Sequence, residues 1–167
     1  ADHPIPRPHV LLLVDHPGDR RRLADALAPQ YTVVLPDTDA AWSGPVDVCL
    51  VDAPALARYH TPLLERKVRE APNFLPVLLI ILRDAVRLIP PAYWEVIDEV
   101  MPIPAEKAEV LRRVSSLLRI RHLTSEVRQK AAVDATLASL AEGLIIYDTA
   151  GHILQFNHIA DGYLEYF

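Results

Sequence analysis

Five short apolar runs in the first two thirds of the chain constrain its fold more than any other feature. They are Val10–Val14, Tyr31–Leu35, Val46–Val51, Val77–Leu82 and Val96–Met101. Most are continuously apolar, which is typical of strands buried on both faces. Segments with helical spacing lie between them, at Asp19–Ala28, Ala55–Ala71 and, interrupted by Pro90 and Pro91, Asp84–Trp94. Strands that alternate with helices predict an α/β fold with a parallel sheet and right-handed crossovers.

The sequence changes character after Pro104. From Ala105 to about Ala141 it contains neither proline nor glycine, which predicts one helix on the order of 50 Å long. Its later apolar residues recur at spacings of three and four, typical of a coiled-coil seam: Ile120, Leu123, Val127 and Leu137. Because such a helix extends past its own domain, we expect a parallel homodimer. The alternative is a solvated, partly helical linker.

A β-hairpin is predicted near the C-terminus. Gly143 is expected to end the long helix as its C-cap. Leu144–Tyr147 and Ile153–Phe156 then flank a turn that contains Gly151, and Asn157–Phe167 can form a short helix. Since a lone hairpin is marginally stable in water, we expect this end to be a domain cut short.

Composition excludes some classes of protein. Of 167 residues, 51% are hydrophobic and 23% are charged, which suits a soluble domain with a core. The net charge of −5 argues against nucleic acid as the main partner. Cys49 is the one cysteine and the longest apolar run is far too short to cross a bilayer, so we expect a cytoplasmic protein. Residues 1–8 are polar and proline-rich, and we interpret them as a leader.

Two aspartates follow predicted strands directly: Asp15 after the first and Asp52 after the third. Ligands of open parallel sheets bind at the carboxyl ends of the strands, so these carboxylates converge if the two strands are neighbours. Paired carboxylates there can hold Mg²⁺, and one can act as a nucleophile toward a phosphoryl group. The alternative is that each aspartate is a turn or helix N-cap residue.

Four segments carry a family resemblance: Leu11–Pro17, Val46–Asp52, Leu75–Ile81 and Met101–Glu106. Through them, residues 9–118 resemble a receiver domain of two-component signalling, the response-regulator (CheY-like) fold. The resemblance implies a flavodoxin-like sheet of five parallel strands in the order 2-1-3-4-5, with helices on both faces. It also implies that Asp52 is the candidate phospho-acceptor and that Asp15 and Asp52 would hold Mg²⁺, the one cofactor we consider.

Three positions depart from the receiver pattern. His16 stands where the second acid is expected, Ile81 where the switch hydroxyl is expected and Met101 where the lysine before a proline is expected. Losing an oxygen ligand, a hydroxyl and a cation weakens metal binding and phosphoryl transfer. We therefore interpret the domain as degenerate and acting by protein contact, with phosphorylation of Asp52 as the alternative. His16 can instead bind a transition metal, sense pH, or simply begin a helix.

Residues 142–167 resemble the start of a PAS domain. The resemblance rests on Ala141–Asp148 and Ala150–Ala160, with Asp148, Gly151 and Asn157 at recurring positions. It implies a multi-domain sensor or regulator in which residues 119–141 connect the two domains. A catalytic output domain, such as a histidine kinase, would lie elsewhere, so we expect no enzymatic activity of this fragment.

Two other classes remain open from the sequence. One is a flavodoxin-type module that binds a nucleotide or flavin, although only Gly18 follows the first strand and no phosphate-cradling glycine run does. The other is a DNA-binding regulator, supported by the arginines between positions 112 and 128. Such a helix surface is more often a solvated face.

Overall fold

The computed structural model describes residues 7–37, 39–140 and 142–164. The chain forms two compact units that divide between Leu123 and Thr124. We call them the N-terminal unit and the C-terminal unit, and each is described by itself. The predicted receiver-like stretch, residues 9–118, lies within the N-terminal unit.

The N-terminal unit contains one parallel sheet of five strands in the order β2-β1-β3-β4-β5, which confirms the predicted fold class. The strands are β1 (His9–Leu13), β2 (Thr32–Val34), β3 (Val48–Asp52), β4 (Val77–Leu82) and β5 (Glu99–Ile103). β1 and β3 are neighbours, with Leu13 opposite Val51. The carboxyl ends of these two strands therefore lie side by side.

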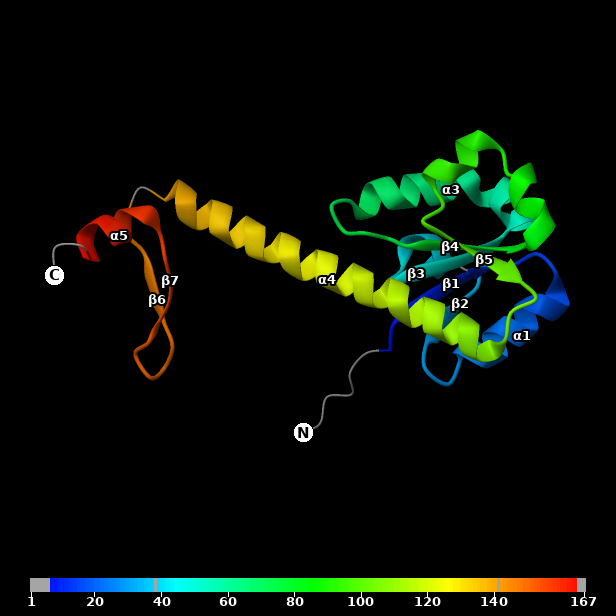
Figure 1. Ribbon diagram of the computed structural model, residues 1–167, viewed down its shortest axis with the longest axis horizontal. Coiled ribbons are helices and arrows are strands. Elements are labelled where there is room, and N and C mark those ends of the chain that lie inside the picture. The colour runs from blue at the N-terminus through cyan, green and yellow to red at the C-terminus, as the bar shows by residue number, and fades with distance from the viewer. Residues whose placement is uncertain (1–6, 38, 141, 165–167) are drawn as a thin grey trace. The chain divides into compact units, whose positions relative to one another are not determined.

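Helices cover both faces of this sheet (Figure 1). α2 (Asp39–Ser43), α3 (Ala53–Glu70) and the 3₁₀ helices η1 (Arg83–Leu88) and η2 (Pro91–Glu95) pack on one face. α1 (Pro17–Leu27) and the first turns of α4 (Lys107–Ser139) pack on the other. The apolar runs fill the two cores between these layers: Leu11 and Leu13 point to the first face, and Val10 and Leu12 to the second. Alternate burial on two covered faces explains why the strand sequences are continuously apolar.

The fifth strand was predicted at Val96–Met101, and its position is wrong. β5 begins at Glu99 and ends at Ile103. Before it, Asp98 ties the loop to β4, since the Val77 N–H donates to Asp98 Oδ2 at 2.8 Å. Pro102 can lie inside β5 because β5 is an edge strand, where a proline without an N–H need not interrupt a ladder. The weak helix predicted at Asp84–Trp94 is replaced by η1 and η2, which Pro90 separates.

The C-terminal unit contains residues 124–139 of α4 and an antiparallel hairpin of β6 (Ile145–Tyr147) and β7 (Ile153–Phe156), followed by α5 (His158–Leu164). The hairpin was predicted, and Gly151 takes the positive φ of 89° that its turn requires. The predicted C-cap at Gly143 is wrong, because α4 ends at Ser139. The predicted ends of the two helices at Ala141 and Phe167 lie outside the described residues.

Asn157 joins the parts of the C-terminal unit. Its Nδ2 donates to the carbonyls of Leu137 and Glu142 at 3.2 and 2.8 Å. Its Oδ1 accepts from the N–H groups of Leu144 and Ala160, each at 3.0 Å. Asn157 is 4% exposed, so these four bonds satisfy a buried amide completely. Within the described residues, no helix is both long enough and apolar enough to span a bilayer.

Candidate functional site

The carboxyl edge of the sheet brings Asp15 and Asp52 together. Asp52 is the last residue of β3, and Asp15 lies two residues past the end of β1. The Asp15 N–H donates to Asp52 Oδ2 at 2.8 Å. The two aspartates that the sequence placed at one rim are thus in direct contact, through the main chain of one and the carboxylate of the other.

Both oxygens of the Asp52 carboxylate accept main-chain hydrogen bonds. Oδ2 accepts from Asp15, and Oδ1 accepts from the N–H of Ala55 at 2.8 Å, which makes Asp52 the N-cap of α3. The capping alternative weighed from the sequence therefore applies to this residue. Capping satisfies a free donor of the helix, and a negative charge is favourable at a helix N-terminus.

The carboxylate of Asp15 is paired with a cation from α3. Arg58 Nη2 lies 2.9 Å from Asp15 Oδ2, with the Asp15 side chain 26% exposed and that of Arg58 61% exposed. A hydrogen bond with Tyr59 and the charge of Asp15 raise the pKa of Arg58. Two carboxylates with waters can hold Mg²⁺, but here Arg58 already pairs with one oxygen of Asp15, so its charge would compete with the ion. Among the described residues, no group of three or more His, Cys, Asp or Glu side chains is placed to hold a metal.

His16 begins α1. Its Nδ1 accepts from the Asp19 N–H at 3.3 Å and lies 3.2 Å from Asp19 Oδ2, and the side chain is 71% exposed. These contacts fit the helix-entry interpretation of His16. Pro17 follows at the first helical position, where its missing N–H costs nothing.

The ends of β4 and β5 are apolar. Ile81 is 5% exposed near the end of β4. Met101, expected at the end of β5, lies mid-strand and is 1% exposed. The residue at the strand end is Ile103, which the sequence analysis missed because it ended the strand two residues early. Met101 and Ile103 pack into the same core, so the rim is apolar at either position.

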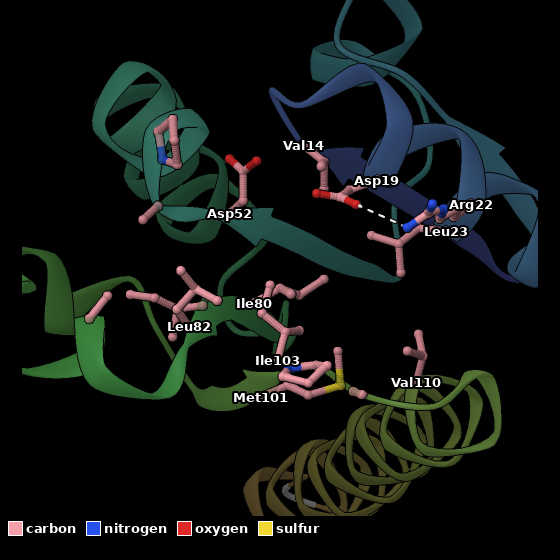
Figure 2. Close-up of a pocket in the computed structure, with 16 residues that line it drawn as sticks. Val14, Asp19, Arg22, Leu23, Asp52, Ile80, Leu82, Met101, Ile103 and Val110 are labelled. Carbon is pink, nitrogen blue, oxygen red and sulfur yellow. Dashed lines mark ion pairs between the residues drawn. The ribbon is translucent and has the colours of Figure 1, made fainter.

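A hollow of about 530 Å³ opens at this edge. Figure 2 shows Asp52 and Val14 on one side of it, with Met101 and Ile103 across from them. Other apolar lining residues include Ile81, Leu82 and Ala85, and the charged ones are Asp19, Arg22 and Asp52. The hollow was not predicted from the sequence, because it depends on the distances between the strand ends.

Comparisons with solved structures bear on the fold. The receiver domain of the TMAO respiratory system response regulator TorR is 21% identical, with a TM-score of 0.52, over 68% of this chain and 98% of that one. The signal receiver domain of an HD domain-containing protein from Pseudomonas fluorescens Pf-5 is 24% identical, with a TM-score of 0.52, over 70% and 98%. The N-terminal unit has the fold of a response-regulator receiver domain.

A longer similar protein is NtrX from Brucella abortus, solved in complex with ADP. It is 19% identical with a TM-score of 0.58, and the match covers 86% of this chain but 32% of NtrX. No family model matches the chain, and no curated protein does. At these identities the likeness to receiver domains concerns the fold, and the site must be interpreted from its own residues.

Proposed function

We propose that the N-terminal unit is a degenerate receiver domain that transmits a signal by protein contact and not by phosphoryl transfer. The observation that carries this proposal is the apolar character of the rim: Ile81 lies one residue before the end of β4 and Ile103 ends β5, where a hydroxyl and an ammonium group would stabilise a phosphoryl group. Charge-assisted hydrogen bonds contribute about 1.5–3 kcal/mol each, so their loss disables the switch.

The acidic side of the rim supports the same proposal. Both oxygens of Asp52 already accept hydrogen bonds from the main chain, which lowers the nucleophilicity of this carboxylate toward a phosphoryl group. Mg²⁺ must neutralise the phosphoryl oxygens, and Arg58 already neutralises Asp15. Arg58 thus supplies a positive charge beside Asp15, as a metal ion would, but it cannot coordinate phosphoryl oxygens as a metal ion does.

Two surfaces are candidates for protein contact. Leu82, Leu88 and Trp94 are 61, 79 and 43% exposed on and beside η1 and η2, and are candidates to contact a partner protein. On α4, Ile120, Leu123 and Val127 are 49, 48 and 68% exposed at spacings of three and four. That spacing suits a coiled coil with a second copy of the chain, so a homodimer is part of the proposal.

The wider context is also a proposal. Residues 142–167 would begin a PAS domain, and the chain would be part of a cytoplasmic multi-domain sensor or regulator whose output domain, such as a histidine kinase, lies elsewhere. The match to NtrX supports this context only in that NtrX is a much longer chain. The 167 residues would have no catalytic activity of their own.

Phosphorylation of Asp52 is the second candidate, because Asp52 lies at the end of β3 beside Asp15. Acetyl phosphate with Mg²⁺, followed by intact mass and peptide mapping, separates the two. We expect no phosphorylated Asp52. The double variant Ile81→Thr with Ile103→Lys restores the hydroxyl and the cation and should gain labelling, which shows that the assay can detect it. Stoichiometric labelling of Asp52 in the unaltered chain would refute the proposal.

A further inference from the structure

The hollow at the carboxyl edge has the dimensions of a ligand site. Its volume of about 530 Å³ lies within the range of roughly 300–1,000 Å³ that is usual for pockets of small molecules. It is lined mainly by aliphatic side chains, with a few charged groups on its border. A hollow of this size therefore suits a small molecule.

Apolar contact would supply most of the binding free energy. Ile81 and Met101 form buried parts of the lining, and Ile103 and Ala105 are half-buried. Leu82, which is 61% exposed, stands at the border. A hydrophobic body that covers these side chains removes apolar surface from water at every contact.

The charges select the class of ligand. Arg22 and Asp19 lie 4.0 Å apart at the border and offset one another. Asp52 is the remaining charged lining residue, so the border carries a net negative charge. Each oxygen of its carboxylate accepts one main-chain hydrogen bond and keeps a second lone pair. A cation can therefore bind Asp52 without breaking either bond, whereas an anion meets a like charge.

We propose that this hollow binds a small organic cation: an aromatic or aliphatic body with one protonated amine. The body lies against Ile81, Met101 and Ile103, and the ammonium group reaches Asp52. Nucleotides and flavin phosphates are disfavoured, because their phosphates would approach the same carboxylate. This site does not depend on the contact function proposed above, since an active receiver could also hold such a ligand.

Binding to the full chain tests the proposal, with three probes that share one ring system: 1-naphthylmethylammonium, the neutral 1-naphthalenemethanol and the anionic 1-naphthoate. Amide chemical shifts are followed by NMR titration, with AMP and FMN as further ligands. We expect the ammonium probe to shift residues around the hollow and to bind about tenfold more tightly than the alcohol. Naphthoate, AMP and FMN should bind more weakly than the alcohol.

Variants locate the site. Asp52→Asn should remove the preference for ammonium over alcohol while alcohol binding persists. Ala85→Phe, which fills the hollow, should weaken both probes about tenfold. Leu88→Phe is its matched control, because Leu88 is in the same 3₁₀ helix, is 79% exposed and is not among the lining residues. It should leave binding unchanged.

Three results would overturn the proposal. They are equal affinity for ammonium and alcohol in the unaltered chain, tighter binding of any of the three anions, and no shift near the hollow at about 5 mM probe. The first two need no variant, so the test stands even if a substitution prevents folding.

Discussion

Replacing Asp52 by alanine should destabilise the N-terminal unit. The sign of this change in stability tests whether the carboxylates of Asp15 and Asp52 repel one another or whether Asp52 stabilises the fold through its hydrogen bonds. In a site where carboxylates repel one another, removing one relieves repulsion and stabilises the fold. Here Arg58 neutralises Asp15, and Asp52 accepts two main-chain hydrogen bonds at 2.8 Å each. The carboxylate of Asp52 therefore contributes stability.

The magnitude follows from these two bonds. Loss of an N-cap side chain costs about 1 kcal/mol. Loss of the bond to the Asp15 N–H, which is partly buried and has a charged acceptor, costs about 1.5 kcal/mol more. We expect Asp52→Ala to lower the free energy of unfolding by about 2–3 kcal/mol. Asp52→Asn, which keeps an acceptor for the cap, should lower it by about 1 kcal/mol.

Urea denaturation followed by tryptophan fluorescence measures this change. The two tryptophans, Trp42 and Trp94, both lie in the N-terminal unit, so the signal reports that unit alone. With a slope of about 2 kcal/mol per molar urea, the midpoint should fall by about 1 M. Glu65→Ala, an exposed carboxylate on the same helix, is the matched control and should change the midpoint little. An unchanged or higher midpoint for Asp52→Ala would refute this account of the rim.

Three further predictions address other groups. Burial raises the pKa of the Cys49 thiol, so Ellman's reagent should react with it only as the N-terminal unit unfolds, and rapid reaction of the folded chain would contradict its burial. Arg58→Ala frees Asp15 and should tighten Mg²⁺ binding about fivefold by calorimetry, whereas unchanged affinity would mean that Arg58 does not compete with the ion. Hydrogen bonds from the main chain and side chain of His152 lower the pKa of Asp148 in the folded chain. The ionised carboxylate therefore stabilises the hairpin turn at pH values above the pKa that Asp148 has in the unfolded chain. This stabilisation is lost as the pH falls through the pKa of Asp148 in the folded chain. NMR shifts of the turn amides should follow that titration below about pH 4, and turn shifts that stay constant there would oppose it.

The fold was predictable because the apolar residues of each strand indicate that it is buried on both faces. Continuous runs such as Val10–Val14 can be stable only between two covered faces, and the strand order followed from the receiver resemblance. One detail was not predictable. Because proline seldom lies inside a strand, Pro102 led us to end the predicted strand at Met101, whereas β5 ends at Ile103.

The contact between Asp15 and Asp52 was also predictable in outline, because each follows a parallel strand and the strands are neighbours. Their partners were not. Arg58 lies more than forty residues from Asp15 in sequence, and it reaches that carboxylate only because α3 starts at Asp52 and carries Arg58 over the rim. The hollow likewise depends on distances between strand ends that no local pattern encodes.

Asn157 has a consequence for how the C-terminal unit can move. One side-chain amide holds the last turns of α4, the segment after it, the start of the hairpin and the first turn of α5. No one of these four attachments can loosen alone without leaving a buried donor or acceptor bare. A change in twist that moves the last turn of α4 would therefore also disturb the hairpin and α5, because the same buried amide holds all three.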